Sequence, residues 1–144
     1  MRLTVYTDYS LRMLIYLAVT DDGLAPIAEV AGAYRISKTH LNKVAHQLGR
    51  AGYVTTVRGK GGGLRLARPA REIGLGAVVR HVEPDMALLP CFDPLDASCP
   101  IIPACGLRGA LREARQALLA VLDRYTLEDL VQRRPDLHVM LHAA

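Results

Sequence analysis

The feature that most constrains the fold is a pair of short amphipathic segments, separated by a tight turn and followed by a glycine-rich hairpin. Pro26 opens the first segment at a position that helices favour, and Ser37 can cap the second. Their apolar residues recur at steps of three and four, which places each set on one helix face: Ile27, Val30, Ala31 and Tyr34, then Leu41, Val44, Ala45 and Leu48. Together they predict a helix-turn-helix.

The residues on either side of this pair predict one more helix before it, and a hairpin and a short helix after it. Residues 53–58 are rich in β-branched side chains and residues 64–66 alternate, with a run of four glycines and one lysine between them, which predicts a hairpin. Thr7 can cap a preceding helix that runs to about Thr20, and a short helix is expected over residues 75–82. The predicted fold is a winged helix, mostly α with a small β-hairpin.

The second half of the chain contains a heptad seam. Its length is marginal for a free coiled coil, so we expect this long dimerisation helix to add to a larger interface. A capping box over residues 126–129 opens a last helix, and the tail after Pro135 carries no clear signal. The seam residues are Leu107, Leu111, Ala114, Leu118, Val121 and Tyr125.

Charge is distributed unevenly along the chain, which has a formal net charge of +4. Residues 1–71 are net +7 and residues 72–144 net −3, which is typical of a polyanion-binding module joined to a separate sensing or pairing region. The apolar run at residues 13–20 is too short to span a bilayer, and no export signal follows it. We therefore expect one compact unit with an appended element, in the cytoplasm.

The face of the second helix opposite its apolar residues is rich in hydrogen-bond donors, which can bond base edges and phosphates. An ordinary solvated face is the alternative, but cations also surround the glycines of the hairpin, where backbone amides can approach phosphates. A nucleotide P-loop lacks its Lys-Ser or Lys-Thr pair here. The candidate DNA contacts are Ser37, Lys38, Thr39, His40, Lys43, Arg58, Lys60, Gly61 and Gly62, with Asn42, Gln47 and Arg50 on the same helix face.

All three cysteines lie in the one long segment without periodicity, residues 84–106. In a cytoplasmic protein such a group indicates a metal or redox site rather than a disulfide framework. Zinc sites usually contain C-x2-C pairs, and none occurs here. The wider spacing of Cys91, Cys99 and Cys105 on an apolar, proline-rich loop suits an iron–sulfur cluster, with one coordination position left for another ligand.

The chain from Leu3 to about Leu130 resembles the IscR/NsrR family of iron–sulfur winged-helix regulators. The motifs that carry the likeness are Thr7-Asp8-Tyr9, Ser37, residues 58–66, Glu83-Pro84 and the three cysteines, and residues 50–55, 102–105 and 125–131 are similar to the nitric-oxide-sensing branch. The other branch has a histidine ligand shortly after the third cysteine, where this chain has Gly106, Leu107 and Arg108.

The resemblance implies that Asp8 of the partner subunit completes a [4Fe-4S] cluster, with [2Fe-2S] as the alternative. A simpler interpretation of Asp8 is a helix-terminal charge paired with Arg12. The implied domains are a DNA-binding winged helix over residues 1–83, a cluster-binding loop over 84–106, dimerisation and last helices over 107–134, and a tail over 135–144.

The implied function is a homodimeric repressor that binds an imperfect palindromic operator and releases it when nitric oxide nitrosylates the cluster. A regulator of iron–sulfur supply or redox state on the same scaffold is the alternative. An enzyme is not expected, because no histidine is spaced with a nucleophile. His138 and His142 can chelate a metal, but such a pair is more typical of a solvated tail.

Overall fold

The computed structural model describes residues 2–93, 98–132, 134 and 136–143. In chain order the elements are α1 (Val5–Val19), α2 (Ile27–Tyr34), α3 (Lys38–Arg50), β1 (Val54–Val57), β2 (Gly63–Leu66), η1 (Ala70–Glu72), α4 (Leu75–Val82), η2 (Pro90–Phe92), η3 (Ile102–Ala104), α5 (Gly106–Leu122), α6 (Leu127–Val131) and α7 (Asp136–His142). This order confirms the predicted class, a mostly helical winged helix with one hairpin and a long helix after it.

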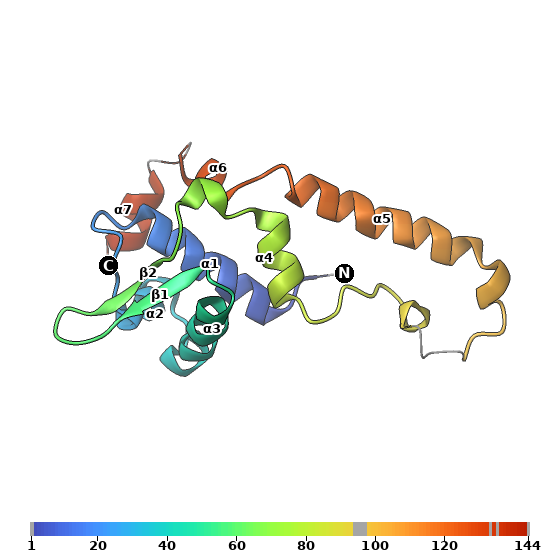
Figure 1. Ribbon diagram of the computed structural model, residues 1–144, viewed down its shortest axis with the longest axis horizontal. Coiled ribbons are helices and arrows are strands. Elements are labelled where there is room, and N and C mark those ends of the chain that lie inside the picture. The colour runs from blue at the N-terminus through green and yellow to red at the C-terminus, as the bar shows by residue number, and fades with distance from the viewer. Residues whose placement is uncertain (1, 94–97, 133, 135, 144) are drawn as a thin grey trace.

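The molecule has two parts, which Figure 1 shows side by side. The first part, called the body, contains α1–α4, the hairpin, α6 and α7. The second part, called the arm, consists of residues 83–122, in which the chain leaves the body after α4 and returns along α5. The proposed loop, helix and tail segments include residues 94–97, 133, 135 and 144, which lie outside the described residues.

The body has a hydrophobic core. Met13, Leu41, Val44 and Leu48 have no exposed surface, because the three-and-four spacing of the apolar residues turns one face of each helix inward. Leu127 of α6 is also buried in this core, although it follows the arm in sequence. The chain therefore returns to the body after α5.

The hairpin is tied to the helix-turn-helix by its own backbone. β1 and β2 pair antiparallel, with Val54 opposite Leu66 and Val57 opposite Gly63. Leu64 also exchanges two backbone hydrogen bonds with Ala25, at 2.8 and 2.9 Å. A Cβ on Gly63 would lie 2.5 Å from the Ala25 carbonyl oxygen, so this close approach requires glycine.

The predicted cap of the first helix is wrong. Thr4, not Thr7, occupies the N-cap of α1, and its hydroxyl accepts the Thr7 backbone N–H at 3.2 Å. Thr7 is fully buried and its hydroxyl donates to the Glu83 carboxylate at 2.5 Å. The Thr4 backbone N–H and hydroxyl donate to the same carboxylate, at 3.0 and 3.1 Å. Glu83 therefore joins the end of α4 to the start of α1.

The C-terminal third differs from the expected seam in two ways. α5 ends at Leu122, so Tyr125, the last seam position, lies beyond the helix. The tail forms α7, which packs on α1 and α2, with the His142 ring 4.9 Å from the Tyr16 ring.

None of the helices in the described part of the chain combines the length and the hydropathy that a membrane span requires.

Candidate nucleic-acid interface and metal centre

One face of α3 is exposed and carries no acidic residue. Leu41, Val44, Ala45 and Leu48 are buried, as the periodicity predicts. Ser37 occupies the N-cap, but within the described residues its hydroxyl makes no capping hydrogen bond. All the candidate contacts on this helix are exposed: Ser37, Lys38, Thr39, His40 and Lys43.

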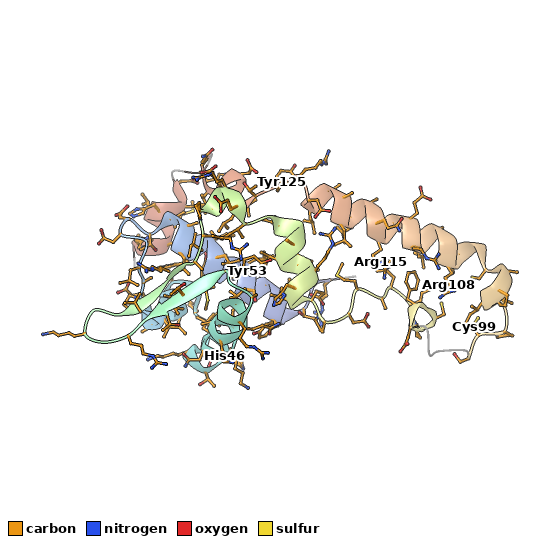
Figure 2. The ribbon with its side chains drawn as sticks, viewed as in Figure 1. His46, Tyr53, Cys99, Arg108, Arg115 and Tyr125 are labelled. Atoms are coloured by element: carbon orange, nitrogen blue, oxygen red, sulfur yellow. The ribbon has the colours of Figure 1, made fainter. Side chains whose placement is uncertain are left out.

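The structure brings α3 and the hairpin together around one hollow, which we call the wing-side hollow. From α3 it is lined by Lys38, Asn42 and His46, and from the hairpin by residues that include Thr56 and Gly62. Figure 2 shows where His46 lies on α3. A protruding helix beside a hairpin is the geometry by which such domains enter a major groove.

The tip of the hairpin agrees only partly with the sequence interpretation. Arg58, Lys60 and Gly61 are exposed. The Gly62 backbone N–H donates to the Gly59 carbonyl at 3.0 Å, so it is already satisfied within the turn. Gly59 and Gly61 have φ of 100° and 77°, so turn geometry alone accounts for the choice of glycine at these two positions.

Sequence reasoning missed that α1 supports α3. The Tyr6 hydroxyl donates to the Lys43 carbonyl at 2.9 Å, and the rings of Tyr9 and His40 lie 6.3 Å apart. Both tyrosines stand next to Asp8 or within two residues of it in the first turns of α1. Their position before an apolar helix gave no signal for this contact, because it depends on how α1 crosses α3.

The cysteines lie in the arm. Cys91 is in η2, Cys99 follows the undescribed residues 94–97, and Cys105 is the N-cap of α5. All three are free and partly buried. Within the described residues, no three His, Cys, Asp or Glu side chains lie together as ligands for one metal ion. The single chain therefore supplies the sulfurs on one segment without assembling a centre.

The chemistry of this segment nevertheless fits an iron–sulfur cluster. Cys105 Sγ accepts the Arg108 backbone N–H at 3.4 Å, in the first turn of α5. The Nε of Arg108 is buried, and in the described part of the chain it has no hydrogen-bond partner. A buried N–H without an acceptor is costly, and an anionic group held near Arg108 would satisfy it.

Asp8 is occupied within its own chain. Its Oδ1 accepts the Arg12 Nε–H at 2.9 Å, and both side chains are nearly half exposed. This hydrogen bond raises the pKa of Arg12. The structure thus contains the simpler pairing expected from the sequence and does not place Asp8 with the cysteines.

His138 and His142 of α7 contact Asp21 and each other. His138 Nε2 lies 3.1 Å from Asp21 Oδ2, and the His138 and His142 rings stack at 4.4 Å. His142 Nδ1 lies 3.0 Å from the His138 carbonyl oxygen. These contacts hold α7 against the body, so the two residues belong to a packed helix rather than to a solvated tail.

Comparison with known families and proteins gives a consistent result. The family described as "Rrf2: Iron-dependent Transcriptional regulator" matches residues 3–133. The HTH-type transcriptional regulator NsrR of Bacillus subtilis strain 168 is 51% identical over 142 residues, which cover 98% of this chain and 97% of that protein. Protein aau3 of Rhizobium meliloti strain 1021 is 46% identical over 141 residues, 98% of this chain and 92% of its own length.

Solved structures share the fold. CymR, the global cysteine regulator of B. subtilis, matches with a TM-score of 0.73 and 26% identity, over 92% of this chain and 98% of that one. T. potens IscR matches with a TM-score of 0.76 at 22% identity, over 95% of this chain and 90% of that one. The second likeness concerns the fold alone.

Proposed function

The chain belongs to the Rrf2 family of transcriptional regulators, and so is a DNA-binding regulator and not an enzyme. On this basis we propose that it is a homodimeric cytoplasmic repressor that holds an iron–sulfur cluster. It would release its operator when nitric oxide reacts with that cluster. The observation that carries the DNA-binding face is the wing-side hollow, which joins the donor face of α3 to the hairpin. The observation that carries the cluster is a set of three free, partly buried thiols on one segment, of which Cys105 accepts the Arg108 backbone N–H.

The DNA contacts in this proposal follow from exposure and donor chemistry. Lys38, Thr39, His40 and Lys43 at the N-terminal half of α3 are placed to meet base edges and phosphates. Ser37 and Gly61 supply further donors, and Arg58 and Lys60 of the wing supply positive charge for the backbone. Gly62 shapes the tip, because its amide is used within the turn.

Dimerisation is proposed from the exposed apolar side chains of the arm. In α5, all of whose residues the structure describes, no residue is buried. Leu107 and Val121, which share the predicted seam, are 60% and 43% exposed. Two copies related by a twofold axis would cover this face and present two α3 helices to a palindromic operator.

In the proposed cluster centre, Cys91, Cys99 and Cys105 are the ligands of one subunit. When bound, a cluster supplies iron that nitric oxide can attack, and [4Fe-4S] is the form that we propose. In the described part of the chain the Arg108 Nε–H has no acceptor, so it would be available to a group held near it. Cys105 stays aligned by the first turn of α5.

Asp8 of the partner subunit is proposed as the fourth ligand, and this requires Arg12 to give up or share its carboxylate. Asp8 stands between Tyr6 and Tyr9, the two residues that contact α3. A change in what Asp8 binds would therefore act on the turn of α1 that supports α3. The state in which Asp8 binds the cluster and the state in which it does not would then differ in interaction free energy, which a switch requires.

The test is operator affinity of anaerobically purified protein before and after nitric oxide, with an absorption spectrum and iron and sulfide counts. We expect a coloured protein whose affinity falls after treatment, and Cys105→Ser to remove both colour and response. Equal affinities before and after treatment would refute the sensing role, and a colourless zinc protein would refute the cluster. Asp8→Ala distinguishes the alternative: an unchanged cluster and unchanged repression would favour a regulator of iron–sulfur or redox status.

A further inference from the structure

α3 forms a ridge between two hollows. One is the wing-side hollow described above. The other lies on the opposite flank of α3, and we call it the α1–α4 hollow because those helices form its far wall. It is lined by Tyr6, Asn42, Lys43, His46, Gln47, Arg50 and His81. Asn42 and His46 line both hollows, so they stand on the crest of the ridge.

The α1–α4 hollow is basic. Lys43 and Arg50 are exposed in α3, and His46 and His81 are exposed beside them. None of the residues that line it is acidic. A surface with several donors and no competing carboxylate is suited to an anion.

The walls of this hollow are held by the core. The Tyr6 hydroxyl donates to the Lys43 carbonyl at 2.9 Å, which joins α1 to the middle of α3. The His81 ring packs edge-on against Tyr53 with 6.1 Å between ring centroids, and Tyr53 is buried. The backbone of α3 and the His81 ring are therefore positioned before any ligand arrives.

The geometry of DNA identifies the ligand. The major groove is about 12 Å wide and admits one helix, so a sugar-phosphate strand flanks that helix on each side. The wing-side hollow faces one of these strands. We propose that the α1–α4 hollow binds phosphates of the other strand, through the charges of Arg50 and Lys43 and a hydrogen bond from His81.

This inference rests on the proposed DNA-binding face and adds a second contact, partly from α4, outside the helix-turn-helix and the wing. Phosphate contacts carry no sequence information directly but fix the position of the protein on the duplex. The α1–α4 hollow would therefore set the register of α3 in the groove. It would also contribute to the salt dependence of binding.

The experiment measures binding by fluorescence anisotropy, over a series of salt concentrations, to an operator selected from a random duplex pool and to a duplex of unrelated sequence. The variants are Arg50→Ala, Arg50→Lys and His81→Ala. Arg71→Ala is the control for loss of one charge, because Arg71 lies in η1, which packs against α6 on the opposite side of the body from α3 (Figure 1). Lys38→Ala and Lys60→Ala probe the α3 and wing contacts, and thermal unfolding checks each fold.

We expect Arg50→Ala to weaken binding about fivefold on both duplexes and to reduce the salt slope by about one for each subunit that contacts DNA. Arg50→Lys should keep the slope, His81→Ala should weaken binding less, and Arg71→Ala should match the parent. The inference is overturned if Arg50→Ala and His81→Ala bind like Arg71→Ala while Lys38→Ala and Lys60→Ala lose affinity. It is also overturned if affinity falls with an unchanged slope. If Lys38→Ala and Lys60→Ala have no effect either, the proposed DNA-binding face itself fails.

Discussion

The body and the arm differ in where their apolar side chains are covered. In the body, α1, α3 and α4 each bury one face in a common core, and Met13, Leu41 and Val78 have no exposed surface. In the arm, α5 has no buried residue among its fully described positions, and Leu107 is 60% exposed. The body therefore buries its own apolar faces, whereas the arm carries the exposed apolar surface and the partly buried cysteines that we propose for a second copy and a cluster.

The largest expected effect contrasts a core leucine with a leucine of the arm. Leu48→Ala should lower the free energy of unfolding by about 3 kcal/mol, because it leaves a cavity in a fully buried site. Leu107→Ala should change the stability of the body by less than about 0.5 kcal/mol. Urea unfolding of both variants measures the difference, and equal losses would remove the distinction between the two parts.

The next prediction concerns the seam. Val121→Asp should raise the dissociation constant of the dimer on the order of 100-fold, because each interface would bury two like charges across the twofold axis. Gln116→Asp, which adds the same charge at an exposed position outside the seam, is the control. Sedimentation velocity over a concentration series measures the constant. A dimer that tolerates Val121→Asp would show that another face covers the arm.

A smaller effect is expected at the junction of the two parts. Glu83→Gln should lower the free energy of unfolding by about 1 to 2 kcal/mol, because a neutral amide oxygen accepts weaker hydrogen bonds from Thr4 and Thr7 than the carboxylate oxygen does. Glu72→Gln, an exposed position in η1, should leave stability unchanged. Chemical denaturation of the two variants gives the comparison. No loss at Glu83 would mean that this carboxylate does not join the start of the arm to α1.

The smallest effect is expected where α5 returns to the body. Arg80 binds Asp123 through two hydrogen bonds of 2.6 Å, and this contact lowers the pKa of Asp123 from its ordinary value of 3.8. A lowered folded-state pKa contributes stability above that ordinary value, and the contribution is lost as the pH falls through the folded value. The protection of amides at the end of α5 against hydrogen exchange, relative to their intrinsic exchange rates at each pH, should therefore fall in acid, and Arg80→Ala should remove this dependence.

Periodicity predicted the body well because its elements are local. The spacing of Leu41, Val44 and Leu48 specifies the buried face of α3, and the helix expected over residues 75–82 is α4. The N-cap of α1 could not be predicted, because Thr4 and Thr7 both suit that position. Only the approach of Glu83, distant in sequence, decides which threonine is buried.

The candidate site could be predicted only in part. The donor face of α3 and the cations of the wing follow from composition at helical and hairpin spacing. The far wall of the α1–α4 hollow does not, because Tyr6 and His81 come from helices whose packing the local sequence does not reveal. The cysteine spacing indicates which sulfurs are available, but a single chain does not show how a dimer would bring them together.

The pairing of Leu64 with Ala25 constrains how the hairpin and α3 can dissociate from DNA. Because the hairpin shares two backbone hydrogen bonds with the residue that precedes α2, it cannot swing away while the helices stay in place. The hairpin and α3 should therefore dissociate from DNA together. A footprint taken during partial dissociation would lose protection of the major groove and of the flanking strand at the same rate. No intermediate bound through the hairpin alone is expected.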